Sequence, residues 1–538
     1  MSAKTLITAY LRLCTALSNG LTAGRKRASF LLCAPLLIII VILVTASLLN
    51  GVAYVRGYVD DTAYHIPMAV EIARHHNPYY VDISSMFTSF WFPAGAETFV
   101  AVIILVTQNI NSTNLSGATL FICFLFVGYS FAGIWTGDPR IRLLCTALVG
   151  VTPVLFAQTR AFYIDIHVGF LIYLTLYLYA LSLATGNATY GYLGISSAFL
   201  TASMKYHGLL FCAVLLPVGV FCVLKSKDRR PAPWSFGIML ACVFFTSGWY
   251  IRNLLLKGNP IYPLPLPWFL RALSMAIGLP YDGVDNYPNL SPQTRLPHPL
   301  IPNAFTDYHF RPDITDDAFG LGFSIALVLW VIAAVRANRM TGPRQRAFWL
   351  TFATSLAIVV ILPFRLSVPR YILFIPAVAA LWPAVISACF RERKTIYALM
   401  YLCVILLSTV YIGGNLINNR SPKSTIFDAM NLLREGRHSD IVEFEFLEQG
   451  NMRIGYLGGR YAFIASLYDR NLTNQLVQIH YHDYLLDKGE NFTDPDDFVA
   501  HIRSLNLDYI CIFDTKVPGA QILVSHFPDK VFVEDIYK

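Results

Sequence analysis

Long apolar runs separated by short polar segments make up the chain to about residue 417. A helix needs about twenty apolar residues to cross a bilayer, and several of these runs approach that length. The runs 191–204 and 208–224 are short, which predicts a broken pair of helices that meet near Lys205. The predicted spans are 30–50, 117–135, 142–158, 166–185, 191–204, 208–224, 235–251, 318–335, 347–363, 371–390 and 395–413.

The composition agrees with this pattern. Hydrophobic residues make up 55% of the chain and charged residues 14%, and the mean hydropathy is +0.52. These values are typical of polytopic α-helical membrane proteins and exclude an ordinary soluble enzyme. The net charge of +8 does not indicate nucleic-acid binding, because the basic residues are scattered in short clusters between apolar runs.

Basic residues orient the predicted spans, because Lys and Arg accumulate in cytoplasmic loops. If every basic cluster is cytoplasmic, an even number of spans separates each from the next, which gives about eleven crossings with the N-terminus inside and the C-terminus outside. The stretch from Glu97 to Val106 is then left over, and we expect a helix in the outer interface there. The clusters stand at 25–27, 140–142, 225–230, 336–346 and 391–394.

The composition changes to that of a soluble domain near residue 418. Helices are predicted at 424–435, 461–470 and 495–505, the last capped by Asp494 with Pro495 at its first position. Strands are predicted at 453–457, 477–481, 509–513 and 531–536. We therefore expect an all-α transmembrane domain over 1–417, with outer loops at 51–116 and 252–317. A small extracytoplasmic α/β domain over 418–538 follows it.

The segment Asp60-Asp61-Thr62-Ala63-Tyr64-His65 follows the first apolar run. Two carboxylates and a histidine are costly to hold beside hydrocarbon, so they suggest chemistry at the membrane boundary. Alternatively, Asp60 or Asp61 caps a helix over 62–76, and the two interpretations are compatible. The predicted orientation also places other ionisable residues at the outer ends of spans, which favours a site on that face: Asp165, Lys205, Arg252, Arg365 and Arg370.

In order and spacing, these motifs resemble the GT-C class of integral-membrane glycosyltransferases over roughly residues 30–390. They are most similar to bacterial relatives of the protein O-mannosyltransferases and the lipid A aminoarabinose transferase. Asp60 and Asp61 fall on the acidic residues that open the first outer loop of that class, and Tyr64-His65-Ile66-Pro67 looks like its "YHLP" version. Tyr163-Ile164-Asp165 matches partly, since Ile166-His167 replaces the usual Leu-Pro. Further matches are Lys205-Tyr206, Trp249-Tyr250-Ile251-Arg252-Asn253, Gly258-Asn259-Pro260-Ile261-Tyr262-Pro263 and Pro369-Arg370-Tyr371.

The resemblance implies transfer of a sugar from a polyprenyl phosphate to an acceptor hydroxyl, with inversion, on the outer face of the bacterial inner membrane. Asp60 would be the base. Asp61 would orient the acceptor or Asp60, or join a divalent cation. Asp165 would be a further catalytic residue, and it and His65 would shape the acceptor side or hold a cation. Tyr64 would help to orient the acceptor. Cations would stabilise the departing phosphate, although interfacial arginines also snorkel to lipid phosphates. The donor-phosphate candidates are Lys205, Arg252, Arg370 and Arg365.

Other classes remain open from sequence. A transporter or flippase for a lipid-linked glycan would place charged residues at mid-span and contain an internal repeat. An O-antigen polymerase or ligase would depend mainly on outer arginines and a histidine. A non-catalytic glycan-binding protein would use the outer domain as its receptor. The sugar, its acceptor (lipid, glycan or protein) and any divalent cation are not identified by the sequence.

Overall fold

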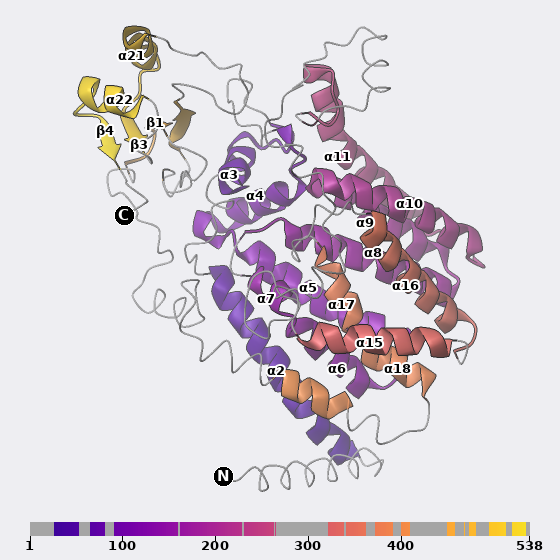
Figure 1. Ribbon diagram of the computed structural model, residues 1–538. Helices are drawn as coiled ribbons and strands as arrows, with labels where there is room; N and C mark the ends of the chain where they lie inside the picture. Colours follow the sequence, from indigo (N-terminus) through magenta and orange to yellow (C-terminus); the bar gives the residue numbers. More distant parts are fainter. Residues whose placement is uncertain are drawn as a thin grey trace, which may run out of the picture.

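The computed structural model describes residues 26–52, 65–80, 91–159, 162–228, 231–262, 264, 321–337, 340–361, 372–390, 400–408, 449–457, 467, 473–479, 494–512 and 519–533. It is mostly helical, with several apolar helices and a small parallel sheet (Figure 1). The first helices are α2 (Lys26–Val52), α3 (Ile66–His75), α4 (Gly95–Thr107), η3 (Ile110–Ser112), α5 (Leu115–Ala132), α6 (Pro139–Gly150), α7 (Pro153–Ala157) and α8 (Asp165–Thr185). They are followed by α9 (Ala188–Met204), α10 (Tyr206–Lys225), α11 (Pro233–Lys257), α15 (Leu321–Arg336), α16 (Pro343–Ile361), α17 (Phe374–Ala379) and α18 (Trp382–Cys389).

Most predicted spans correspond to one helix, and two are divided. The run 142–158 becomes α6 and α7, because Pro153 cannot donate a backbone hydrogen bond and disfavours a helical residue before it. The run 371–390 becomes α17 and α18, with Pro383 in the first turn of α18. The predicted break at Lys205 is present, since this residue is extended (φ −164°, ψ 154°) between α9 and α10.

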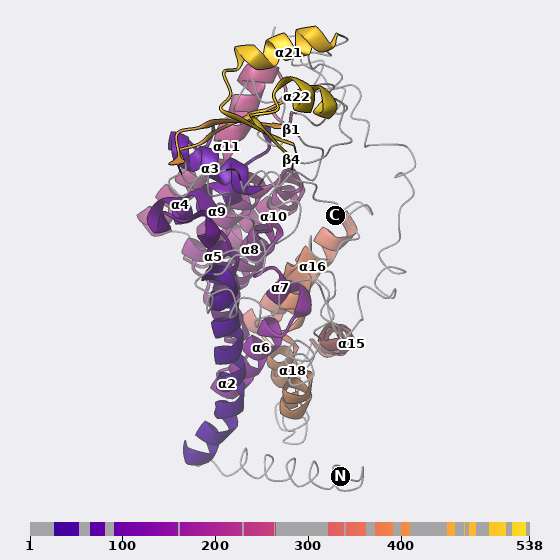
Figure 2. The ribbon, with the colours of Figure 1, turned by 90° about the vertical axis from the view of Figure 1, so that its left-hand side faces the viewer.

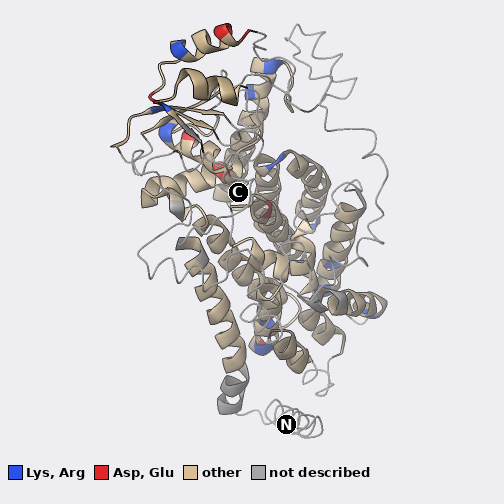
Figure 3. Ribbon diagram, turned by 60° about the vertical axis from the view of Figure 1, so that its left-hand side comes forward, with Lys and Arg blue, Asp and Glu red and all other residues tan. Residues whose placement is uncertain are grey.

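Several helices have the character of membrane spans. Among the described residues, α5, α8, α10 and α11 are long and apolar enough to cross a membrane. Charged residues are sparse over the helical part of the molecule (Figure 3). Helix α11 leaves many large apolar side chains exposed, which fits contact with lipid rather than with water. These side chains are Trp234, Phe236, Ile238, Leu240, Phe244, Ile251, Leu255 and Leu256. The number of spans and their orientation stay predictions.

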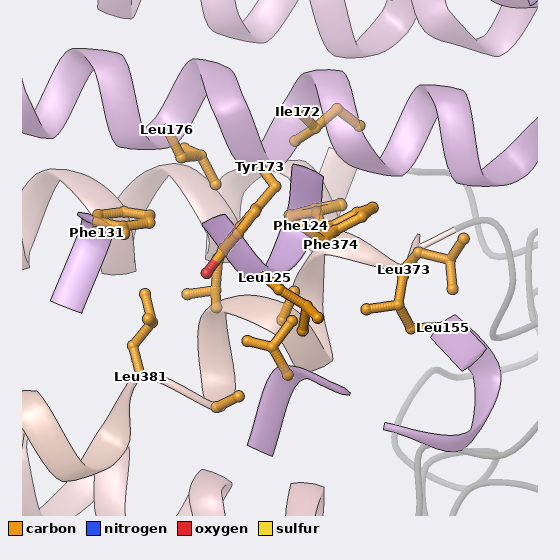
Figure 4. Close-up of a cluster of buried hydrophobic side chains, with 14 of the residues drawn as sticks. Phe124, Leu125, Phe131, Leu155, Ile172, Tyr173, Leu176, Leu373, Phe374 and Leu381 are labelled. Carbon is orange, nitrogen blue, oxygen red and sulfur yellow. The ribbon is translucent and has the colours of Figure 1, made fainter. Parts of the chain in front are cut away.

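Helix α8 forms the centre of the helical core. It packs against α5, α9, α16 and α17, and it is apolar on all sides, as a helix without a lipid-facing side should be. The Tyr173 ring stacks on Phe124, with centroids 5.4 Å apart, inside a cluster that reaches Leu373 and Phe374 (Figure 4). Gly169 allows Leu373 to approach, because a Cβ there would lie 2.7 Å from the Leu373 side chain. This packing fixes the start of α8, where Asp165 lies.

The C-terminal part contains a parallel sheet in the order β2-β1-β3-β4. The strands are β1 (Arg453–Leu457), β2 (Gln475–Gln478), β3 (Tyr509–Ile512) and β4 (Val531–Val533), so β2 begins two residues before its predicted start. Helix α21 (Pro495–Ser504) has the predicted cap, since Asp494 accepts a hydrogen bond from the backbone N–H of Asp496. Helix α22 (Ala520–His526) was not predicted. The helices expected at 424–435 and 461–470 lie outside the described residues, except for Leu467.

The sheet lies beside α3, at the end of the molecule away from the start of α2 (Figures 1 and 2). Arg74 Nη1 donates a hydrogen bond of 3.0 Å to the carbonyl oxygen of Asn474. Leu476 of β2 packs against the helical core. These contacts connect the C-terminal sheet to the helix that follows the acidic motif.

The close contact of α10 with α9 yields a stability prediction. A Cβ at Gly208 would collide with the carbonyl oxygen of Thr201, which is backbone and cannot move aside. We expect Gly208→Ala to lower the free energy of unfolding by at least about 1–3 kcal/mol, as overpacking does. Thermal unfolding in lipid nanodiscs measures this. Gly237→Ala on α11, where nothing lies within 4 Å of the added carbon, is the matched control. Equal melting temperatures for the two variants would contradict the prediction.

Candidate functional site

The structure describes four of the sequence-predicted site residues: His65, Asp165, Lys205 and Arg252. The other candidates lie outside the described residues. They are Asp60, Asp61, Tyr64, Arg365 and Arg370. The geometry of the site is therefore built from the four described residues and from the side chains that contact them.

Lys205 and Asp165 form an ion pair at the break between α9 and α10. Lys205 Nζ lies 3.1 Å from Asp165 Oδ1. The Asp165 carboxylate stands in the first turn of α8, where the helix dipole favours a negative charge. Its side chain is 2% exposed, whereas that of Lys205 is 27% exposed. The Lys205 ammonium thus provides a partner for the buried carboxylate of Asp165, while the lysine side chain remains partly exposed.

A second pair joins His65 to Glu97. His65 precedes α3, and Glu97 lies in the first turn of α4. A hydrogen bond of 2.6 Å connects His65 Nδ1 and Glu97 Oε1, and the two residues are 4% and 3% exposed. Sequence reasoning missed Glu97, which it placed at the start of an interfacial helix. A single acidic residue in an apolar stretch was the available signal.

Two contacts bring these pairs together. The Phe162 ring, three positions before Asp165, meets the His65 ring edge-on with centroids 5.6 Å apart. Helix α4 begins against the end of α9, since a Cβ at Gly95 would lie 2.6 Å from Ser203 Oγ. Ser203 stands just before the Lys205 break. Helices α3, α4, α8 and the α9–α10 junction therefore meet at one place.

Arg252 joins the same region through Asn253 and Tyr206. Its Nε and Nη2 donate to Asn253 Oδ1 at 3.0 and 2.8 Å. Asn253 Nδ2 donates to the hydroxyl of Tyr206 at 3.0 Å, and Tyr206 follows Lys205 directly. The hydroxyl of Tyr206 in turn donates to the carbonyl oxygens of Trp91 and Tyr262. These hydrogen bonds thus hold Arg252 near the chain segment that carries Lys205.

Residues Tyr79 and Tyr80, which follow α3, also bind the Arg252 guanidinium. Arg252 Nη1 donates to the carbonyl oxygens of Tyr79 and Tyr80, at 3.3 and 3.5 Å. The hydroxyl of Tyr79 donates to the carbonyl oxygen of Phe245 at 2.9 Å. Burial raises the pKa of Tyr79, so this hydroxyl keeps its proton at neutral pH. The loop is therefore anchored to α11, and it limits the positions that the guanidinium can take.

The balance of charge favours an anion here. Asp165 and Glu97 each have a basic partner, while Arg252 has no carboxylate within 4 Å in the described part of the chain. Lys257 adds a further cation, 5.1 Å from the centre of the Trp91 ring, and sequence reasoning did not single it out. Lysine and arginine side chains are suited to binding a phosphate group.

No metal site is apparent where the chain is described. No group of three or more His, Cys, Asp or Glu side chains there could hold a metal ion. The paired residues Asp165 and Glu97 take part in ion pairs instead. Whether Asp61 joins a divalent cation stays a prediction.

No protein-family model matches this chain, and no curated protein matches it. Among solved structures, the chain is similar to ArnT from Cupriavidus metallidurans bound to undecaprenyl phosphate, with 12% identity and a TM-score of 0.47 over 84% of this chain and 87% of that chain. It is also similar to apo ArnT from the same organism, with 12% identity and a TM-score of 0.39 over 84% and 86% of the two chains.

The Lys205–Asp165 pair yields a second prediction. Lys205→Met keeps most of the side-chain volume but removes the ammonium from a buried carboxylate. We expect it to lower the free energy of unfolding by about 1–3 kcal/mol, the cost of taking a partner from a buried polar group. Asp165→Asn in the same protein should recover part of that loss, because the amide carries no charge. Thermal unfolding of the two single variants and the double variant measures the coupling. Strictly additive effects would exclude it.

Proposed function

We propose that this chain is a GT-C class glycosyltransferase of the cell inner membrane. It transfers a sugar from a polyprenyl phosphate to an acceptor hydroxyl on the outer face, with inversion. The observation that carries the proposal is that Lys205, paired with the buried Asp165, is followed directly by Tyr206, which Asn253 connects by hydrogen bonds to Arg252 of α11. The order of the sequence motifs supports the same class.

The cations would bind the phosphate of the donor. A departing polyprenyl phosphate carries negative charge, and positioned cations stabilise that charge as it develops. Lys205 is partly exposed. Arg252 has no described acidic partner, so its charge can act on a ligand. Arg365 and Arg370 are proposed to complete this side of the site.

Asp60 is the proposed base. His65 is held between Glu97 and Phe162. Asp60 stands five positions before His65 in the sequence. Asp61 would orient the acceptor or Asp60, or join a divalent cation. Asp165 would shape the acceptor side through the position of Lys205, and Tyr64 and His65 would contact the acceptor.

The reaction follows from these roles. Asp60 takes the proton of the acceptor hydroxyl as its oxygen attacks the anomeric carbon. The bond between that carbon and the phosphate oxygen breaks on the opposite face, and the electron pair leaves with the polyprenyl phosphate. Attack opposite the leaving group inverts the configuration. The acceptor proton on Asp60 is later lost to water.

A substitution of Asp60 tests the proposed base. Asp60→Asn should leave the protein folded and lower sugar transfer by at least about 100-fold, the lower end of what a positioned general base contributes. The measurement is release of free undecaprenyl phosphate from purified protein in nanodiscs. Donors would carry glucose, mannose, arabinose or aminoarabinose, and an extract of envelope lipids and glycans would supply acceptors.

Asp497→Asn, an exposed carboxylate at the start of α21, is the control and should leave transfer unchanged. Full turnover by Asp60→Asn would remove Asp60 from the role of base. No release by the wild-type protein with any of these donors would instead favour a transporter, a polymerase or ligase, or a glycan-binding protein.

A substitution of Arg252 tests donor binding. Removing one charge-assisted hydrogen bond costs about 1.5–3 kcal/mol, so Arg252→Ala should weaken binding of undecaprenyl phosphate by roughly 10- to 100-fold. Displacement of a fluorescent undecaprenyl phosphate measures this. Lys225→Ala, which removes an exposed cation at the far end of α10, should bind as the wild-type protein does. The same affinity in both variants would argue against a phosphate site at Arg252.

A further inference from the structure

Glu97 belongs to no sequence motif, yet its Oε1 lies 2.6 Å from Nδ1 of His65, a residue proposed to contact the acceptor substrate. We propose that Glu97 is a positioning residue of the transferase, which holds the His65 imidazole in one orientation beside the Asp165–Lys205 pair. The inference rests on the proposed function and adds to it a residue that acts on the acceptor side.

Burial is the first argument. Glu97 and His65 are each less than 5% exposed. Withdrawing a carboxylate and an imidazole from water is costly, and a buried pair of this kind is seldom more stabilising than apolar side chains of the same size. Helices α3 and α4 already present apolar side chains to the core, such as Val70 and Val100. The pair therefore suggests a purpose other than holding the two helices together.

The direction of the hydrogen bonds is the second argument. Glu97 Oε1 meets His65 Nδ1, while Glu97 Oε2 is buried and takes no hydrogen bond from the described residues. A carboxylate on Nδ1 places the ring proton there and fixes the tautomer. In that tautomer the ring lone pair is on Nε2, which can accept a hydrogen bond. Glu97 thus determines which ring nitrogen of His65 can accept a hydrogen bond from the acceptor substrate.

Position is the third argument. The His65 ring touches Phe162, which leads into Asp165 at the start of α8. Gly95, two residues before Glu97, packs against Ser203 at the end of α9. The helix that carries Glu97 is therefore fixed against the same junction that carries the ion pair. A shift of Glu97 would move the imidazole relative to the proposed donor phosphate.

A second pair on α3 provides a matched comparison. Glu71 Oε2 lies 3.5 Å from His75 Nε2, one turn apart on the same helix, and the His75 side chain is 44% exposed. This pair also joins a carboxylate to an imidazole, but it lies near the end of α3, and Glu71 Oε1 pairs with Arg74 Nη1 as well. Glu71→Gln removes the charge from a carboxylate that contacts an imidazole, as Glu97→Gln does, so it controls for the loss of such a charge away from the candidate site.

The test compares Glu97→Ala, Glu97→Gln, His65→Ala and the double variant Glu97→Ala/His65→Ala in the release assay. We expect kcat to fall about 100-fold in Glu97→Ala, the size of effect that misplacement of a reacting group produces. Affinity for undecaprenyl phosphate should change less than about twofold, because the cations bind it. Glu97→Gln keeps an oxygen that accepts from Nδ1–H, so it should retain at least about a tenth of kcat. The double variant should be no slower than His65→Ala, because Glu97 acts through His65.

Some outcomes would overturn the inference. They are full kcat in Glu97→Ala, multiplicative losses in the double variant, loss of donor affinity instead of kcat, or a fall in Glu97→Gln as large as that in Glu97→Ala. If Glu97→Ala does not fold, Glu97→Gln against Glu71→Gln decides, with a three- to tenfold fall in kcat expected only for Glu97→Gln and equal rates excluding the role. Turnover by the wild-type protein supports the proposed function, so a failure among the variants then concerns only the role of Glu97. If the wild-type protein shows no turnover, the proposed function itself is wrong.

Discussion

A charge buried among apolar helices needs a partner, and this constraint governs the centre of the molecule. Transfer of an isolated charge from water to such an interior costs far more than one hydrogen bond returns. The buried carboxylates of Asp165 and Glu97 are accordingly paired with Lys205 and His65. Each pair joins residues distant in sequence. The two pairs therefore connect α3 to α4 and the start of α8 to the α9–α10 junction, and they place ionisable groups where the helices meet.

The break at Lys205 makes this arrangement possible. Inside a continuous helix, the backbone groups of a lysine would be hydrogen-bonded within the helix, and the helix geometry would set the direction of its side chain. Here the backbone of Lys205 is extended, so α9 ends just before this residue and α10 begins just after it. Tyr206, at the start of α10, extends the effect by linking the junction to Asn253 and thereby to Arg252. The break between α9 and α10 thus positions Lys205 directly and is linked to Arg252 through Tyr206 and Asn253.

Some features could be predicted because their causes are local. Long apolar runs gave most helices, since the bilayer requires length and apolarity regardless of neighbours. The short runs around Lys205 predicted a break that the structure contains. The cap at Asp494 depends only on its own N-terminal turn and was also predicted. The division of the apolar run 142–158 into α6 and α7 was not predicted, although Pro153 is a local signal that breaks a helix.

The sequence by itself determined that the chain is rich in apolar helices, that Lys205 interrupts them, and that His65, Asp165, Lys205 and Arg252 are candidate site residues. Only the tertiary structure decided how these residues combine. Glu97 is a partner of His65, and Asn253 with Tyr206 joins Arg252 to the Lys205 junction. The physical reason is that apolarity is a property of each segment, whereas the partner of a buried charge is set by which helices pack together. That packing depends on side chains far apart in the sequence, such as Gly95 against Ser203.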